Sequence, residues 1–249
     1  MSKPLTNKIA LVTGGSRGIG AAIARRLADD GAHVAISYSS SADKADALVK
    51  ELIGKGVKAI AVKADQADAA QVERLVDTVK DKLGGLDILV NNAGVFVPGL
   101  LGDPANDMKA FARQQAINVN GTVAAVRSAV KYMKKGGRIV TIGSVIGERS
   151  LFPGGSDYAA TKAAVAAYSR GWARDLGPKG ITVNTIQPGP INTDMNPENS
   201  EMSEGAKAMT LLGRYGQPEE IAGAVAFIVG PDASYITGAT LNVDGGVNS

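Results

Sequence analysis

The sequence predicts an α/β fold in which helices cover both faces of a parallel sheet. Short apolar runs alternate with segments of helical periodicity about seven times along the 249 residues. The runs are continuously apolar rather than alternately apolar and polar, which is typical of parallel strands buried on both faces. Connections between such strands are right-handed, so we expect a Rossmann-type, doubly wound sheet of about seven parallel strands.

The first part of the chain supplies four strand–helix pairs. After the first apolar run, Ile19, Ile23 and Leu27 recur every fourth residue, as they do on one face of a helix. Gly31 follows that helix as an expected C-cap. The same reasoning predicts strands over 9–12, 33–36, 57–62 and 86–90, and helices over 18–29, 42–55, 69–83 and, as one longer helical region, roughly 105–134.

The second part continues this alternation around one irregular segment. Strands are predicted over 138–142, 181–186 and 239–243, and helices over 158–176 and 218–229. Residues 189–216 interrupt the pattern because they are rich in Pro, Asn and Ser. We interpret them as a substrate lid with a short helix, and the alternative is a long surface loop. No linker-like stretch divides the chain, so residues 1–249 are expected to form a single domain.

The composition excludes several kinds of chemistry. The chain has no cysteine and a single histidine, His33, which excludes disulfides and cysteine zinc sites and leads us to expect no metal. Lys and Arg exceed Asp and Glu by only 27 to 24, without the basic stripe of a nucleic-acid-binding protein. No apolar run reaches the roughly 18 residues that span a bilayer, and none near the N-terminus resembles a signal peptide. We therefore expect a cytoplasmic protein that binds neither nucleic acid nor membranes.

The first strand leads into a glycine-rich turn, Thr13–Gly20, with the sequence TGGSRGIG. Its glycines allow a tight turn and let a phosphate approach the backbone amides at the start of a helix. This favours a dinucleotide cofactor, although a turn of this kind also occurs as a plain strand–helix connection. The residues expected to contact the cofactor here are Gly14, Ser16, Arg17, Gly18, Ile19 and Gly20.

The end of the second strand favours NADP(H) over NAD(H). An NAD site places an acidic residue here to bind the ribose hydroxyls, but residues 31–42 contain no Asp or Glu. The chain has instead Tyr38, Ser39 and Ser40, with Arg17 in the facing turn. A 2′-phosphate would be repelled by a carboxylate and accepted by a guanidinium and hydroxyls. The alternative is that Arg17 is simply solvated and that the serines begin a loop.

Polar side chains also follow the third and fourth strands. Asp65 stands where it could bind an adenine amino group, although a turn or N-cap carboxylate would look the same. Asn91–Gly94, with the sequence NNAG, combines small residues and amides at a strand end. This segment leaves room for a ribose and also serves as a structural turn.

Tyr158 and Lys162 are four residues apart on the predicted helix 158–176, so they share one face. A tyrosine with its ordinary pKa of about 10 is a poor base at neutral pH, and a nearby ammonium favours the phenolate. Ser144 follows the strand 138–142, and strand ends on this side of the sheet converge on the ligand crevice. Ser144 can therefore bind a substrate oxygen while Tyr158 transfers a proton. The YxxxK spacing alone also fits an exposed tyrosine and a solvated lysine.

Six motifs occur in order along the chain, namely Thr13–Gly20, Asn91–Gly94, Asn118–Gly121, Ser144, Tyr158 with Lys162, and Pro188–Gly189. In this combination the sequence resembles the short-chain dehydrogenase/reductase family, from about residue 7 to the terminal Val243–Gly246. Within the family it looks like the 3-oxoacyl-acyl-carrier-protein-reductase-like subgroup, whose members act on many carbonyl compounds. The resemblance implies a single dinucleotide-binding and catalytic domain and a homotetramer.

The resemblance also implies a role for each matching residue. Tyr158 is the proton donor in reduction, and Lys162 lowers its pKa and binds the nicotinamide ribose. Ser144 polarises the carbonyl, and Asn118 holds a water of a proton relay through its backbone carbonyl. Further cofactor contacts are implied for Asp65, Gln66, Asn92, Ala93, Gly94, Tyr158, Lys162, Pro188, Gly189, Ile191 and Thr193.

These observations predict an NADPH-dependent carbonyl reductase, which is a reversible alcohol dehydrogenase interconverting CH–OH and C=O groups. Most side chains near the catalytic motifs are apolar, which favours a small or medium apolar ketone or aldehyde. The residues expected to contact the substrate are Ser144, Val145, Phe96, Phe152 and Met195. The alternative is a nucleotide-binding sensor on the same fold with little or no turnover.

Overall fold

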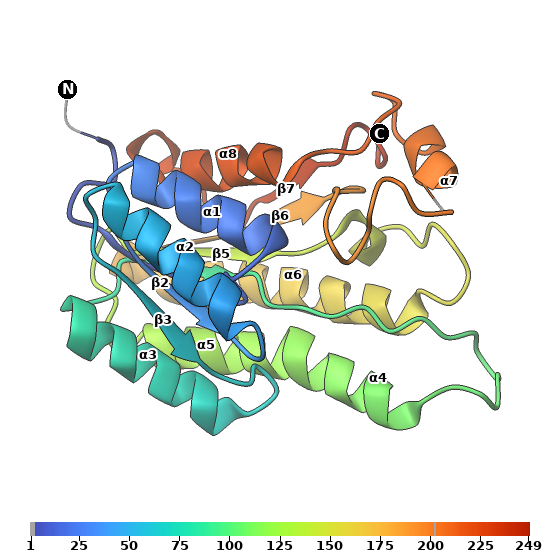
Figure 1. Ribbon diagram of the computed structural model, residues 1–249, viewed down its shortest axis with the longest axis horizontal. Coiled ribbons are helices and arrows are strands. Elements are labelled where there is room, and N and C mark those ends of the chain that lie inside the picture. Colours follow the sequence, from blue (N-terminus) through green and yellow to red (C-terminus); the bar gives the residue numbers. More distant parts are fainter. Residues whose placement is uncertain (1–2, 202) are drawn as a thin grey trace.

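The computed structural model describes residues 3–201 and 203–249. Within them, seven strands form one parallel sheet in the order β3-β2-β1-β4-β5-β6-β7. Figure 1 shows helices on both faces of this sheet. The predicted doubly wound, Rossmann-type sheet of parallel strands is therefore confirmed.

Most elements lie within two residues of the predicted segments. The strands are β1 (Ile9–Val12), β2 (His33–Tyr38), β3 (Ala59–Lys63), β4 (Ile88–Asn91), β5 (Arg138–Ile142), β6 (Thr182–Pro188) and β7 (Thr240–Val243). The helices are α1 (Gly18–Asp29), α2 (Ala42–Gly54), α3 (Ala69–Leu83), α4 (Met108–Gln115), α5 (Gly121–Ala129), α6 (Ser156–Leu176), α7 (Ser203–Ala208) and α8 (Pro218–Val229).

The largest departure from the predicted elements lies in the region 105–134. Helices α4 and α5 are joined by a π-helix, Ala116–Asn120, instead of forming one continuous α-helix. Across it, the amide of Gly121 donates a hydrogen bond to the carbonyl of Ala116, five residues back. Such one-residue widenings of a helix are rare and occur frequently at functional sites.

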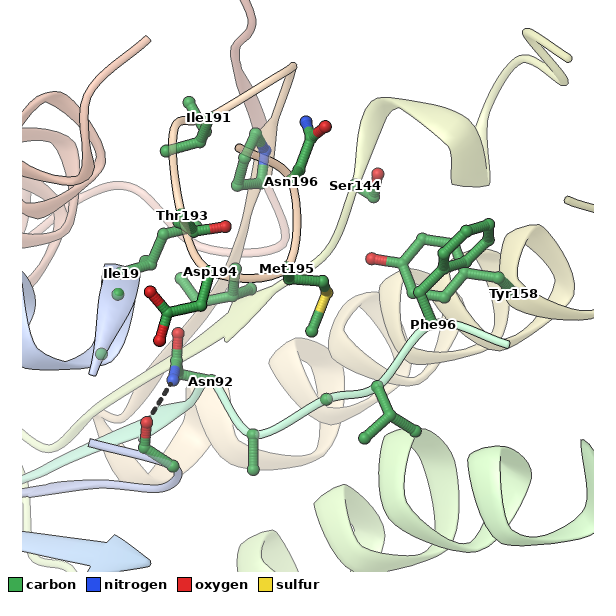
Figure 2. Close-up of a pocket in the computed structure, with 18 of the residues that line it drawn as sticks. Ile19, Asn92, Phe96, Ser144, Tyr158, Ile191, Thr193, Asp194, Met195 and Asn196 are labelled. Carbon is green, nitrogen blue, oxygen red and sulfur yellow. Dashed lines mark hydrogen bonds between the residues drawn. The ribbon is translucent and has the colours of Figure 1, made fainter. Parts of the chain in front are cut away.

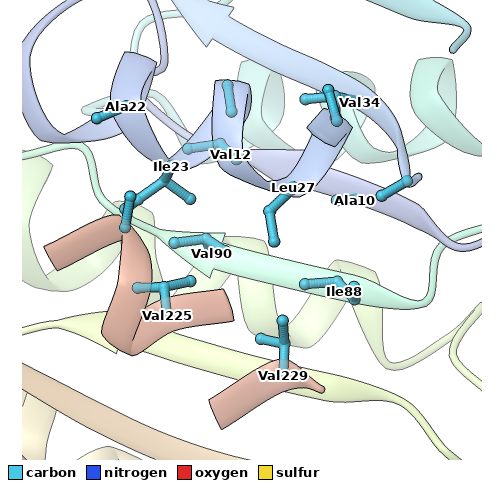
Figure 3. Packing of buried hydrophobic residues seen from close by; sticks show 14 of the residues in the cluster. Ala10, Val12, Ala22, Ile23, Leu27, Val34, Ile88, Val90, Val225 and Val229 are labelled. Atoms are coloured by element: carbon cyan, nitrogen blue, oxygen red, sulfur yellow. The ribbon is translucent and has the colours of Figure 1, made fainter. Parts of the chain in front are cut away.

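Two hydrophobic clusters fix the helices to the sheet. On one face, Leu27 of α1 and Val225 of α8 pack with Val90 of β4 (Figure 3). On the other face, Val76 of α3 and Val126 of α5 belong to a second cluster that also includes residues of α6. Both clusters consist mainly of aliphatic side chains, and together they cover the two faces of the sheet. The polar residues that follow the carboxyl ends of the strands lie outside these clusters and are free to form a binding site. None of the helices in residues 3–201 and 203–249 is long and apolar enough to cross a bilayer.

Residues 189–216 run from the end of β6 to the start of α8 with little regular structure. The short helix α7 interrupts them, as predicted. Isolated bridges join Ile191 to Gly216 and Thr193 to Asn196, so the segment folds back on itself. Met202, within this segment, lies outside the described residues.

Candidate active site

A cleft of about 1040 Å³ opens at the carboxyl ends of the strands. It lies beside β1 and β4, where the strand order changes direction, which is the point at which doubly wound sheets bind ligands. Figure 2 shows Ser144 and Tyr158 on one side of the cleft and the loop carrying Thr193 on the other. All residues predicted to contact a cofactor or a substrate line this cleft. Of the predicted catalytic residues, Asn118 is the one that does not.

The glycine-rich turn brings its backbone unusually close to the neighbouring turn. Gly14 has a φ of +63°, a conformation that favours glycine. A Cβ atom on Gly20 would lie 2.5 Å from Nδ2 of Asn92, so only glycine fits at this position. The first turn of α1, Gly18–Ala21, carries no carboxylate, and the helix N-terminus favours negative charge. The turn therefore borders the cleft with the polarity that a phosphate group requires.

The Asn92 side chain joins the NNAG turn after β4 to the glycine-rich turn. Its Nδ2 donates hydrogen bonds to the carbonyls of Thr13, at 2.9 Å, and Gly14, at 3.1 Å. The Thr13 hydroxyl in turn accepts from the amides of Asn92, at 3.0 Å, and Ala93, at 3.1 Å. The NNAG segment thus acts as a structural clamp while Asn92, Ala93 and Gly94 border the cleft.

The serine-rich end of β2 faces the same cleft, but Arg17 is held by a residue that the sequence did not indicate. The Arg17 guanidinium lies 3.4 Å from the carboxylate of Asp194, and the Lys44 ammonium lies 3.3 Å from the same oxygen. The hydrogen bond from Lys44, followed by Arg17, holds the pKa of Asp194 below its usual value. Arg17, Ser39 and Ser40 all line the cleft.

Asp65 is engaged within the protein. Its carboxylate accepts hydrogen bonds from Arg113, at 3.1 Å, and from the amide of Ala67, at 3.0 Å, so it is a turn carboxylate as well as a cleft residue. Gln66 also borders the cleft and is 7 % exposed. Both polar atoms of the Gln66 side chain are buried without a partner in the described part of the chain.

Lys162 and Tyr158 lie side by side on α6 at the floor of the cleft. Lys162 is 6 % exposed, and its Nζ donates a hydrogen bond of 2.9 Å to the carbonyl of Ile142. The same Nζ lies 5.6 Å from the centroid of the Tyr158 ring. Burial lowers the pKa of Lys162 to about 8.

Burial, and not Lys162, dominates the pKa of Tyr158 in this structure, so the lowering by Lys162 that the resemblance implies stays a prediction. Burial of the phenol raises the pKa of Tyr158 to about 12, and the nearby Ser144 side chain opposes this rise only in part. The spacing of the two residues correctly placed them on one face but contained no information on burial, which is the dominant effect. Tyr158 is consequently protonated at neutral pH, which is the state that a proton donor requires.

An apolar wall stands beside the Tyr158 hydroxyl. The Phe96 ring contacts the Tyr158 ring edge to face, with centroids 5.1 Å apart, and Phe152 packs on Phe96 at 6.1 Å. Val145 and Met195 also line the cleft, and Met195 is 54 % exposed. The space next to Ser144 and Tyr158 is therefore bordered mostly by carbon.

Asn118 acts on this wall through its side chain. Its Oδ1 accepts from the amide of Val95 and its Nδ2 donates to the carbonyl of Val95, both at 2.9 Å, and Nδ2 also donates to Thr161 at 3.0 Å. Its backbone carbonyl, to which we assigned a water, accepts a hydrogen bond of 2.9 Å from the Thr122 hydroxyl. Asn118 thus clamps the backbone just before Phe96.

Sequence reasoning missed a second clamp after Phe96. Gln114 is fully buried, and its Oε1 accepts a hydrogen bond of 2.7 Å from the amide of Val97. The sequence did offer one signal for this clamp, because Gln114 lies one helical turn before Asn118. Two amides on one helix face, if buried, require polar partners, and the nearby chain can supply them. Lys44 and Asp194 gave no such signal, since 150 residues separate them.

Comparisons with known proteins match nearly the whole chain. The family model described as "Enoyl-(Acyl carrier protein) reductase" matches residues 14–248. The chain is 46% identical over 241 residues to the cyclic-di-GMP-binding biofilm dispersal mediator protein of Escherichia coli K12, covering 96% of this chain and 97% of that protein. It is 44% identical over 248 residues to a 3-oxoacyl-[acyl-carrier-protein] reductase of Synechocystis, covering 98% of each.

A solved structure shows the same fold with a bound nucleotide. It is a short-chain dehydrogenase from Burkholderia cenocepacia in complex with NADP, 46% identical, with a TM-score of 0.97 over 99% of this chain and 100% of that one.

Proposed function

Because the chain belongs to the short-chain dehydrogenase/reductase family of oxidoreductases, we propose that it is an NADPH-dependent carbonyl reductase, able to run in reverse as an alcohol dehydrogenase. The observation that carries the proposal is the convergence of Ser144, Tyr158 and Lys162 on one cleft with the glycine-rich turn. The glycine-rich turn can hold the phosphates of a nicotinamide cofactor and is called the cradle below. The phenol of Tyr158, the hydroxyl of Ser144 and the ammonium of Lys162 lie in the same cleft, where they can transfer a proton to a carbonyl oxygen beside that cofactor.

The cradle fits a dinucleotide on its own geometry. A Cβ on Gly20 would collide with Nδ2 of Asn92 and with the carbonyl oxygen of Gly14, so this glycine lets the cradle and the NNAG turn pack together, and the amides at the start of α1 favour an anion. The residues that would hold NADP(H) are those of the glycine-rich turn, Ser39, Ser40, Lys162 and Thr193. When bound, the reduced nicotinamide supplies a hydride to the carbonyl carbon of the substrate.

The remaining steps belong to side chains of the protein. The Ser144 hydroxyl donates a hydrogen bond to the carbonyl oxygen and polarises it. The Tyr158 hydroxyl, protonated at neutral pH, gives its proton to that oxygen as negative charge develops there. The Lys162 ammonium stabilises the phenolate that remains, and a group with a pKa of about 8 can return a proton to it from solvent. We retain the backbone carbonyl of Asn118 as part of that proton route.

The substrate is a small or medium apolar ketone or aldehyde. The walls around the reacting position are formed by Phe96, Phe152, Val145 and Met195, with few charges near them. We further propose that residues 189–216 act as a lid on a single domain of residues 1–249, and that the protein works as a cytoplasmic homotetramer.

The test is oxidation of NADPH, followed by its absorbance, in the presence of a panel of apolar ketones and aldehydes. Tyr158→Phe should lower kcat about 10³-fold, because it removes the proton donor. Tyr168→Phe makes the same change on an exposed residue of the same helix and should leave kcat unchanged. Undiminished turnover in Tyr158→Phe would refute the mechanism, and no oxidation of NADPH by the wild type with any carbonyl would refute the function.

A second candidate is a nucleotide-binding sensor with little or no turnover. The Escherichia coli relative, named for binding cyclic-di-GMP, favours it. A sensor would bind NADPH in a calorimetric titration yet show no oxidation of NADPH with any carbonyl, and Tyr158→Phe would then leave binding and every other readout unchanged.

A further inference from the structure

The residues after β7 form a short tail, 244–249, that contacts the turn presenting Ser144. The Nδ2 atom of the half-buried Asn248 donates hydrogen bonds to the carbonyl of Val145, at 3.3 Å, and to the carboxylate of Glu148, at 3.4 Å. Both acceptors belong to the 3₁₀ turn that directly follows Ser144. The two hydrogens of one amide group thus hold the two ends of this turn.

The same turn determines where the Ser144 hydroxyl points. The Oγ of Ser144 accepts a hydrogen bond of 3.3 Å from the amide of Ile146, and the carbonyl of Ser144 accepts one of 2.9 Å from the amide of Gly147. The turn also packs on α6, because a Cβ on Gly147 would lie 2.9 Å from the amide nitrogen of Ala163, next to Lys162. A shift of the turn would therefore move the serine hydroxyl relative to the catalytic side chains of α6.

A residue that positions another must itself be held firmly, and the tail meets this condition. The carboxylate of Asp244 accepts hydrogen bonds from the amides of Gly246, at 2.9 Å, and of Asn248, at 3.0 Å, which folds the tail back on itself. Val247 is 5 % exposed and fixes the tail to the rest of the protein. The Asn248 side chain consequently reaches the Ser144 turn from an anchored backbone.

The tail also contacts two other segments beside the cleft. A Cβ on Gly189 would lie 2.7 Å from the Cα of Asp244, so the tail begins directly against the segment that follows β6. The amide of Leu212, in the proposed lid, donates a hydrogen bond of 3.2 Å to the carbonyl of Gly245. The tail thus connects the Ser144 turn with the proposed lid.

We propose that Asn248 is a positioning residue of the active site, which holds the Ser144 hydroxyl at the carbonyl oxygen of the substrate. The inference rests on the proposed reductase function and adds to it a residue that is absent from the described residues lining the cleft. A looser turn lowers the fraction of bound substrate whose oxygen receives the hydrogen bond of Ser144. The rate of the chemical step then falls, while the cofactor binds as before.

The first experiment measures NADPH oxidation with a carbonyl compound that the wild type reduces. Asn248→Ala should lower kcat about tenfold and change the calorimetric Kd for NADPH less than about twofold. In a Ser144→Ala background the same substitution should lower kcat less than about twofold, because Asn248 acts through the hydroxyl that is already missing. A merely structural role would lower kcat by the same factor in both backgrounds.

Three further variants separate the donated hydrogen bonds from the shape of the side chain. Asn248→Asp keeps the shape but turns a carboxylate toward the Val145 carbonyl and the Glu148 carboxylate, so it should lower kcat at least as far as Asn248→Ala. The matched controls Asn242→Ala and Asn242→Asp change an exposed asparagine of β7 and should leave kcat and the Kd for NADPH unchanged.

The second experiment requires no turnover. Hydrogen exchange of residues 144–149, measured by mass spectrometry on the full-length protein without cofactor, should be about fivefold faster in Asn248→Ala than in the wild type. The reason is that the amides of Glu148 and Arg149 both donate to the Val145 carbonyl that Asn248 holds. Asn242→Ala should exchange at the wild-type rate.

The proposal is overturned by an equal loss of kcat in the two backgrounds, by an unchanged kcat in Asn248→Asp, or by unchanged exchange of residues 144–149. A wild type that oxidises no NADPH with any carbonyl compound would instead refute the proposed function. The exchange experiment would then still decide whether Asn248 holds the turn.

Discussion

Replacing the buried lysine of the cleft, Lys162→Met, should make the cofactor-free protein more stable at neutral pH. The lysine ammonium is 6 % exposed and faces a carbonyl rather than a carboxylate. Its pKa falls from 10.5 to about 8 because burial disfavours the charged form. Methionine keeps most of the length and the apolar stem of lysine without the charge.

The magnitude follows from that pKa. Holding a proton below pH 8 on a group whose pKa is lowered from 10.5 to about 8 destabilises the folded protein by roughly 3 kcal/mol. Losing the hydrogen bond to Ile142 offsets about 1 kcal/mol of the gain. Lys162→Met should therefore be more stable by about 2 kcal/mol at pH 7, or about 4–8 °C in Tm for a chain of this size.

The sign of the pH dependence is fixed by linkage. Between pH 8 and 10.5 the unfolded wild type binds more protons than the folded wild type, so wild-type stability rises with pH. The advantage of Lys162→Met should consequently be complete below pH 8 and shrink to near zero by about pH 9.5.

The assay is urea denaturation of both proteins from pH 6.5 to 9.5, at equal protein concentration and without cofactor. Lys179→Met, an exposed lysine in the turn after α6, is the matched control and should track the wild type at every pH. A variant that is less stable than the wild type at pH 7, or a difference that stays constant over this pH range, would refute the reasoning.

Three further predictions concern the site and the core. Ser144→Ala should lower kcat in the NADPH oxidation assay about 10–100-fold, because it removes the group that donates to the carbonyl and that opposes the high pKa of Tyr158; an unchanged kcat would contradict it. Gly20→Ala should abolish calorimetric NADPH binding, since its Cβ would lie 2.5 Å from Nδ2 of Asn92 and from the carbonyl oxygen of Gly14 and would displace the turn, and retained binding would contradict the requirement for glycine at this position. Leu27→Ala should cost about 3 kcal/mol in urea denaturation, because Leu27 is fully buried between α1 and the sheet, and a loss below about 1 kcal/mol would contradict that packing.

Much of the fold follows from local patterns. The strand β5 and the helices α1, α3 and α8 begin and end where periodicity and glycine or proline signals placed them. Continuous apolar runs identified parallel strands, because both faces of each strand are covered. The one internal error, the π-helix within 105–134, arises because an extra residue in a helix changes hydrogen bonding without removing the apolar periodicity.

The candidate site was predictable where a motif specifies backbone geometry, and less so where side chains meet across the fold. The glycine-rich turn and the Tyr158–Lys162 pair are local, so their spacing carried the information. The ion pairs of Asp194 with Lys44 and Arg17 join residues that are 150 and 177 positions apart in the sequence. The periodicity of the sequence contains no information on such a contact. The direction of the Tyr158 pKa depends on burial by the surrounding fold, which a four-residue spacing does not contain.

The π-helix Ala116–Asn120 sets the rotation of α4 relative to α5, so the active site depends on the number of residues in this segment as well as on their identity. Deleting Ala116 or Ile117 would restore regular α-helical bonding and rotate the helix before the deletion by about 100° relative to the helix after it. Gln114 and Asn118, which grip the chain on either side of Phe96, would then no longer point at the same loop. A one-residue shortening of this helix would thus leave a well-folded helix and a misshapen catalytic wall, although every side chain of the site is still encoded.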